Sequence, residues 1–235
     1  MRLTSLRLVT FVIILLSLSY LITGVLSLYD ISELSFALVF PFLLLYYFIR
    51  KQLKFSFFTI FLLFYTLAET TFFYKNYVSF SYYSEIFYGI LAFLALLVFV
   101  FLQINFKALF KKFYVQIIIL ILLGVYVFYT LERIMVSHFA YGLSMIDFVI
   151  DSMYNLSFIL VLIFSLLNYL QTDSKKNLIL FLSCGCLVFS ELVQVIYFFA
   201  DQKKILHIVY SFLLISGCCL SYLFINIKDD KYILE

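Results

Sequence analysis

Long apolar runs separated by short polar clusters fill almost the whole chain of 235 residues. A run of about 20 apolar residues is long enough to cross the hydrocarbon core of a bilayer as an α-helix. The runs therefore predict an all-α fold: a polytopic integral membrane protein whose bundle of about eight transmembrane helices forms one domain over residues 1–235. The predicted spans cover about residues 8–28, 34–49, 55–74, 84–105, 113–131, 146–170, 177–199 and 205–226.

Composition agrees with this class of protein. Hydrophobic residues make up 66% of the chain and charged residues 12%, with a mean hydropathy of +1.14, which no soluble domain approaches. The net charge of +3 does not indicate a nucleic-acid partner, because the basic residues are scattered at the ends of the predicted helices. Charged and polar clusters predict loops between the spans, among them Asp30 with Glu33, and Glu132 with Arg133 and His138.

The distribution of basic residues predicts an orientation. Twelve of the 16 Lys and Arg residues lie in the N-terminal segment, the C-terminal tail and the connections after the second, fourth and sixth spans. Cytoplasmic loops of membrane proteins carry the excess of basic residues. We therefore expect a multi-pass protein of the cell membrane with both termini in the cytoplasm.

Two carboxyl side chains interrupt the apolar runs at matched depth. Glu69 and Glu191 each lie 15 residues after the last preceding Lys, and each lies in the third span of its half of the chain, as a parallel duplication would place them. A rise of about 1.5 Å per residue puts both roughly 22 Å into a hydrocarbon layer about 30 Å thick. A carboxyl at such depth costs about 2.5–3.5 kcal/mol and is rarely accidental.

Other polar residues fall in the same outer half of the predicted bundle. Asp147, Asp151 and Asn155 are spaced four residues apart and therefore share one helix face. Asp147 and Glu85 lie at the membrane boundary, where solvated helix-end charges are expected. The residues that we expect to bind a substrate beside Glu69 and Glu191 are Asp151, Asn155, Gln194, His207 and Tyr210. Their grouping predicts one pocket that is reached from the outer face or the outer leaflet.

Two carboxyls in one low-dielectric pocket disfavour double ionisation, so one of them stays protonated. The protonated group can act as a general acid, while the ionised group orients or deprotonates a water molecule. Such a pair suits hydrolysis through an oxocarbenium-like state, of a glycosidic bond or of an enol ether. The sequence does not assign the acid and the base between Glu69 and Glu191.

The same carboxyls have other interpretations. A neutral Glu in a membrane helix can act only as an interhelical tie, bonded to hydroxyl groups such as those of Thr66, Thr70 or Ser190. A proton-coupled transporter of a small molecule would use the carboxyls as proton sites, although the inner halves of the spans hold no comparable acid. A non-catalytic membrane protein would hold a partner or a lipid through its helix faces.

The cysteines add no further chemistry. All four lie within apolar spans, and no His or carboxylate is positioned to complete a tetrahedral metal site with them. We expect free thiols that pack as small apolar side chains, and neither a metal nor another cofactor. The four residues are Cys184, Cys186, Cys218 and Cys219.

Three short motifs are similar to those of the YhhN, or lysoplasmalogenase-like, family of eight-span membrane proteins. Ala68 and Glu69 stand where the family has a Gly-Asp pair, and residues 89–94 (GILAFL) resemble its next span. Residues 183–191 (SCGCLVFSE) correspond to a later family segment that ends in Ser-Asp, and Tyr210 matches a Tyr of the final span.

The resemblance implies hydrolysis of the vinyl-ether bond of a lysoplasmalogen-type lipid, with a lysolipid or another membrane-soluble small molecule as ligand. Glu69 and Glu191 would then be the general acid and base. Besides Ala68 in place of Gly, the chain departs from the family at four positions. Both signature Asp residues are Glu, Leu97 replaces a His, and Phe40 precedes Pro41 where the family has Lys.

Overall fold

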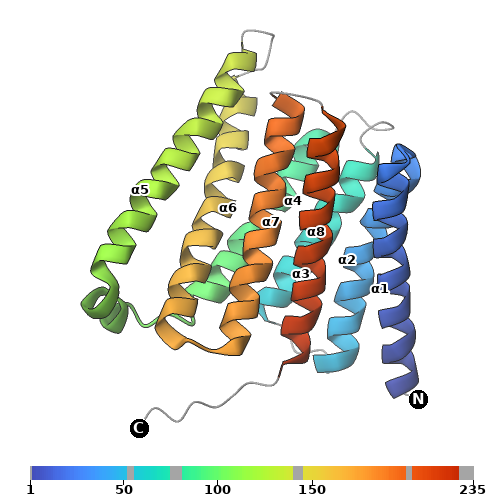
Figure 1. Cartoon of the computed structure of the whole chain (residues 1–235), viewed down its shortest axis with the longest axis horizontal. Coiled ribbons are helices and arrows are strands. Elements are labelled where there is room, and N and C mark those ends of the chain that lie inside the picture. Colours follow the sequence, from blue (N-terminus) through green and yellow to red (C-terminus); the bar gives the residue numbers. More distant parts are fainter. Residues whose placement is uncertain (1, 52–55, 75–80, 140–144, 200–202, 228–235) are drawn as a thin grey trace.

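The computed structural model of the chain describes residues 2–51, 56–74, 81–139, 145–199 and 203–227, and these residues form eight α-helices (Figure 1). Seven of the helices are long and apolar enough to cross a membrane, and α3 contains a shorter apolar stretch, Phe57–Thr71. The predicted all-α, multi-pass membrane fold is confirmed. The helices are α1 (Arg2–Val25), α2 (Tyr29–Lys51), α3 (Phe57–Tyr74), α4 (Ser81–Phe101), α5 (Phe106–Phe139), α6 (Met145–Thr172), α7 (Lys175–Phe199) and α8 (Lys204–Asn226).

Six helices form a ring in the order α2, α3, α4, α6, α7 and α8, because α4 packs against α6 and α2 packs against α8. α1 lies outside the ring beside α2 and α8, and α5 lies outside it beside α6 and α7. Successive helices run in opposite directions, so α1 begins at the same end of the bundle at which α8 ends (Figure 1). We call this the termini end and the opposite end the cavity end.

The first connection is shorter than expected. α1 ends at Val25, and the chain turns through Ser27, whose φ of 63° lies in the left-handed region. α2 then begins at Tyr29, so Asp30 and Glu33 lie in its first two turns rather than in a loop. The prediction of an acidic loop was wrong because acidic side chains are favourable at a helix N-terminus, where backbone N–H groups carry partial positive charge.

α5 is longer than its predicted span and is kinked. Phe113 has φ −125° and ψ 27°, so the helix is interrupted at the residue where the span was expected to begin. The helix continues to Phe139 and includes Glu132, Arg133 and His138, which were expected in a loop. That prediction was wrong because Glu132 and Arg133 form hydrogen bonds while they remain part of the helix. Glu132 accepts hydrogen bonds from α6, and Arg133 Nε donates to a tyrosine hydroxyl one turn earlier.

Small residues bring α7 and α8 into close contact. A Cβ atom on Gly217 would lie 2.8 Å from side-chain carbons of Leu187, closer than packed carbon atoms approach. Ser183 Oγ on α7 donates to the carbonyl oxygen of Gly217 at 3.0 Å and also bonds the Ser221 hydroxyl at 2.7 Å. Close backbone approach and buried hydroxyl bonds are typical of helix packing in membranes. The contact fixes the helix that carries Glu191.

Candidate functional site

A cavity of about 330 Å³ lies within the ring of helices, and all eight helices contribute to its lining. Its residues come from the C-terminal portions of α1, α3, α5 and α7 and from the N-terminal halves of α2, α4, α6 and α8, so it lies toward the cavity end. The structure brings all the residues predicted for the site to this one cavity. They are Glu69, Asp151, Asn155, Glu191, Gln194, His207 and Tyr210.

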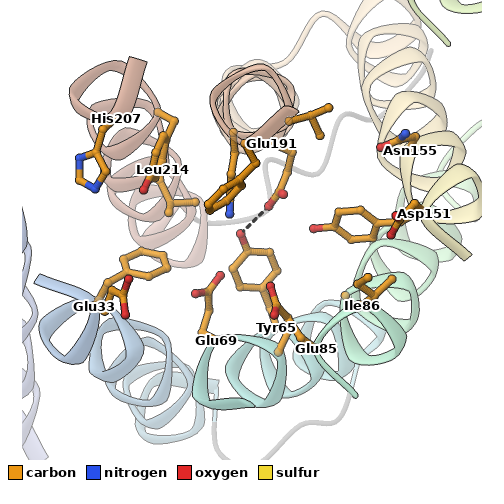
Figure 2. A pocket seen from close by; sticks show the side chains of 18 of the residues that line it. Glu33, Tyr65, Glu69, Glu85, Ile86, Asp151, Asn155, Glu191, His207 and Leu214 are labelled. Atoms are coloured by element: carbon orange, nitrogen blue, oxygen red, sulfur yellow. Dashed lines mark hydrogen bonds between the residues drawn. The ribbon is translucent and has the colours of Figure 1, made fainter. Parts of the chain in front are cut away.

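Of the two predicted catalytic residues, Glu191 on α7 is more buried than Glu69, with 7% of its surface exposed. The Tyr65 hydroxyl donates a hydrogen bond to Glu191 Oε1 at 3.0 Å across the cavity (Figure 2). The Tyr154 side chain on α6 also interacts with this carboxyl. Glu191 is therefore contacted from two other helices, which compensates part of the cost of burying a carboxyl.

Tyr65 is held in place by three phenylalanines. Its ring centroid lies 4.3 Å from that of Phe40, 5.6 Å from that of Phe61 and 6.1 Å from that of Phe93, and all four side chains are buried. Tilted and edge-on contacts at these distances are favourable for aromatic rings. The packing leaves the Tyr65 hydroxyl as the polar tip of an otherwise apolar wedge, aimed at Glu191.

Glu69 lies one helical turn after Tyr65 on α3, so both side chains project from the same face. Its partly buried carboxyl interacts with Tyr65 and with Glu191. In Figure 2 the Tyr65 ring stands beside Glu69 and points to Glu191, which places one hydroxyl near both carboxyls. A hydroxyl group both donates and accepts hydrogen bonds, so this arrangement can accommodate one protonated and one ionised carboxyl.

The hydroxyls considered as interhelical ties have other partners. Thr66 Oγ1 donates to the carbonyl oxygen of Leu62 at 2.7 Å, and Thr70 Oγ1 donates to that of Thr66 at 2.9 Å, both within α3. Ser190 Oγ donates to the carbonyl oxygen of Tyr210 at 3.0 Å, which joins α7 to α8 through the backbone. Glu191 is instead tied across helices by two tyrosines, Tyr65 on α3 and Tyr154 on α6.

A glycine determines how close Tyr154 comes to the cavity wall. A Cβ atom on Gly89 of α4 would lie 2.7 Å from Cε2 of the Tyr154 ring. The ring also packs against Phe93 and Phe158, with centroids 5.7 and 5.6 Å away. Any larger residue at position 89 would displace Tyr154, so the contact between Tyr154 and Glu191 depends on this glycine.

The predicted polar stripe on α6 divides at the cavity. Asp151 and Asn155 line the cavity and are 8% and 2% exposed, whereas Asp147 is not among the lining residues and accepts a hydrogen bond from Tyr83 at 2.7 Å. Asn155 Nδ2 donates to Glu132 Oε1 at 3.5 Å and contacts Met135 Sδ at 3.0 Å. Its amide therefore ties α6 to α5 as well as facing the cavity.

The α8 residues form one side of the wall. The His207 ring lies 4.9 Å from that of Tyr210 and 5.8 Å from that of Tyr197, centroid to centroid. It is directed away from Glu191 in Figure 2, toward α1, where a Cβ atom on Gly24 would lie 3.5 Å from its Cε1 atom. Gln194 lies one turn beyond Glu191 on α7 and also lines the cavity.

Several lining residues were not predicted as site residues, among them Tyr20, Glu33, Tyr65 and Tyr154. Tyr65 carried a usable signal, because it precedes Glu69 by four residues and must share its helix face. Glu33 was assigned to a loop, and a loop residue has no predictable direction. Tyrosine is abundant in this chain, so Tyr20 and Tyr154 had nothing to distinguish them.

Comparisons of the chain with protein-family models, with curated proteins and with solved structures find no match. The fold and the cavity define the class of protein: a multi-pass α-helical membrane protein with an acidic and aromatic cavity inside its helix bundle. The similarity to YhhN proteins remains a resemblance between short motifs.

Proposed function

We propose that the protein is a membrane-embedded hydrolase that cleaves the vinyl-ether bond of a lysoplasmalogen-type lipid, with Glu69 and Glu191 as general acid and base. One observation carries the proposal. Two carboxyls from helices on opposite sides of a single cavity lie beside the same tyrosine hydroxyl, that of Tyr65. In such a group, one carboxyl can stay protonated while the other is ionised.

The reaction needs one proton donor and one group that handles water. The protonated carboxyl transfers its proton to the alkene carbon of the vinyl ether, which leaves an oxocarbenium ion. The other carboxyl removes a proton from water as its oxygen adds to the cation, and a hemiacetal forms. Collapse of the hemiacetal breaks the carbon–oxygen bond and releases an aldehyde and an alcohol. The acid has then lost a proton and the base has gained one, so a proton passed between them restores both.

Tyr65 is the group that suits this last transfer. Its hydroxyl donates to Glu191 and lies next to Glu69, so it can release a proton toward one carboxyl while accepting one from the other. The buried phenylalanines around the ring hold the hydroxyl in this position. The motif resemblance at residues 68–69 and 183–191 supports the same pair of carboxyls as the reacting groups.

The position of the cavity favours a reaction site at one end of the bundle over a route across the membrane. Its lining is confined to the cavity end, and the predicted orientation places this end outside, with both termini in the cytoplasm. A proton-coupled transporter needs access from both sides. A lipid substrate reaches the cavity from the outer leaflet under this proposal.

The proposal is tested by turnover of the full chain in lipid nanodiscs, with release of a long-chain aldehyde from vinyl-ether lysolipids as the readout. We expect turnover that falls by about 10²-fold or more in Glu69→Gln and in Glu191→Gln. Asp147→Asn is the matched control, because this acid lies at the same end of the bundle but outside the cavity lining. Unchanged turnover in both Gln variants would refute the assignment.

A further inference from the structure

The cavity contains more carboxyl groups than the proposed hydrolysis uses. Glu33, Glu85 and Asp151 line it in addition to the two proposed reacting residues. None of the described lining residues is a Lys or an Arg, and the single histidine is directed toward α1. The wall therefore presents five acidic side chains to whatever occupies about 330 Å³ of internal space.

The carboxyls are spread around the wall rather than gathered at one point. Figure 2 shows Glu33 on one side and Asp151 on the other, with Glu69 and Glu85 between them and Glu191 opposite. Among the described residues, no group of three or more His, Cys, Asp or Glu side chains is arranged to hold a metal ion. A ligand that satisfies several of these carboxyls must therefore be larger than a bare cation.

Aromatic side chains line the cavity together with the acids. Tyr20, Tyr65, Tyr154 and Tyr210 line the cavity together with Phe36 and Phe198. The faces of Tyr and Phe rings attract ammonium groups by about 0.5–2 kcal/mol each, more when water is excluded. Acids combined with aromatic rings in a cavity of about this size are suited to a small organic ligand with positive charge.

We propose that the cavity binds an organic cation, a protonated amine or a quaternary ammonium group attached to an apolar body. The ionised carboxyls of the wall stabilise such a charge and repel an anion. A phosphate group would be disfavoured inside this wall, so a phospholipid substrate would have to keep its phosphate outside the cavity. The inference concerns what the cavity holds and does not require that any bond be cleaved.

The test uses three probes of nearly equal size and different charge: 4-phenylbutylamine, 4-phenylbutan-1-ol and 4-phenylbutanoate. Binding to the full chain in phosphatidylcholine nanodiscs is measured by calorimetry, and empty nanodiscs correct for partition into the lipid. We expect the amine to bind about tenfold more tightly than the alcohol, a difference of about 1.4 kcal/mol, and the carboxylate to bind more weakly than both. Equal affinities for amine and alcohol, or tighter binding of the anion, would overturn the inference.

Variants assign the selectivity to the cavity. Glu33→Gln and Asp151→Asn each keep the shape of the side chain and are expected to lower amine affinity about three- to tenfold without changing alcohol affinity. Asp147→Asn, outside the lining, is expected to change neither. A similar loss of amine affinity in all three variants would assign the effect to surface charge and overturn the inference. If either cavity variant fails to fold, the preference among probes in the unaltered chain still decides.

The two experiments can refute the cation site and the proposed hydrolysis independently. The probes contain no vinyl ether, so amine selectivity is measured whether or not the chain is a hydrolase. Selective amine binding without aldehyde release would refute the proposed hydrolysis alone, whereas aldehyde release without amine selectivity would refute the cation site alone.

Discussion

Tyr65 links packing to chemistry more directly than any other side chain of the site. Its ring belongs to the aromatic core between α2, α3 and α4, and its hydroxyl reaches the carboxyl of Glu191 on α7. The aromatic contacts and the hydrogen bond act on different atoms of one residue. They can therefore be separated by removing the hydroxyl alone.

Tyr65→Phe removes the donor and leaves the ring in contact with its aromatic neighbours. The Glu191 carboxyl then loses a buried hydrogen bond, which we expect to lower the free energy of unfolding by about 0.5–2 kcal/mol. Aldehyde release is expected to fall about tenfold, because the proposed proton transfer between the carboxyls loses its intermediate group. Thermal unfolding in detergent and turnover in nanodiscs measure the two effects.

Tyr20→Phe is the control for this substitution. Tyr20 also lines the cavity and also donates one buried hydrogen bond, at 2.9 Å, but its acceptor is the Ser211 hydroxyl rather than a carboxyl. We expect a comparable loss of stability with little loss of turnover. Equal losses of turnover in the two variants would mean that Tyr65 acts on packing and not on proton transfer.

From the sequence, we could identify those residues of the candidate site whose polarity differs from that of the apolar run around them. Glu69 and Glu191 stand out because a carboxyl is costly within an apolar run. Tyr65 and Tyr154 do not stand out, because an amphipathic ring is equally suited to a protein core, a membrane interface and a cavity wall. Their part in the site depends on which helix faces meet. That information resides in the packing of α3, α6 and α7 and not in any one segment.

At the scale of helices, α5 is the element with the weakest attachment. Among the described residues it packs mainly against α6 and α7, its first residue Phe106 also contacts Phe101 of α4, and most of its apolar side chains face outward. Near the cavity end it is tied by polar bonds: Glu132 accepts from Ser152 Oγ at 2.7 Å and from Asn155 Nδ2 at 3.5 Å. Since Met135, one turn later, lines the cavity, this tie also holds one part of the cavity wall.

Glu132→Leu removes both acceptors and should loosen the C-terminal part of α5. Interhelical hydrogen bonds in membranes contribute about 0.6 kcal/mol each, so loss of two is expected to raise local hydrogen exchange about eightfold. Exchange mass spectrometry on peptides that cover the end of α5 measures the change. Glu132→Gln retains an acceptor and should behave almost as the unaltered chain. The Thr130 hydroxyl donates to the carbonyl oxygen of Tyr126 within α5, so Thr130→Val should have no such effect.

The apolar pattern predicted the existence and order of the helices, but not where α2 and α5 begin or end. Burial of about 20 apolar residues is a strong and local signal. A charged residue near a helix end is ambiguous, because it marks a loop when it is solvated and a helix when a neighbouring helix supplies a partner. Glu132 belongs to the second case, and its partners are 20 and 23 residues away.

At the scale of the whole molecule, most basic residues and the acids of the cavity lie at opposite ends of the bundle. Arg50, Lys111 and Lys175 lie at the termini end, and the acids of the cavity lie toward the other end. The positive-inside tendency predicts that the basic end lies in the cytoplasm, and the acids of the cavity lie toward the opposite end. In the predicted orientation, the cavity proposed to bind a cation faces the outside, and the basic end faces the cytoplasm.

Labelling of single cysteines tests this orientation. In a chain whose four native cysteines are replaced by Ala, Met145→Cys lies at the cavity end and Leu102→Cys at the termini end, at positions 78% and 68% exposed. We expect a membrane-impermeant maleimide to label Met145→Cys in intact cells, and Leu102→Cys only after the membrane is permeabilised. The two sites are matched as exposed apolar positions at helix ends, so a difference reports the side of the membrane. The reverse pattern would place the cavity toward the cytoplasm. The proposed substrate would then have to arrive from the inner leaflet, although the cavity chemistry would be unchanged.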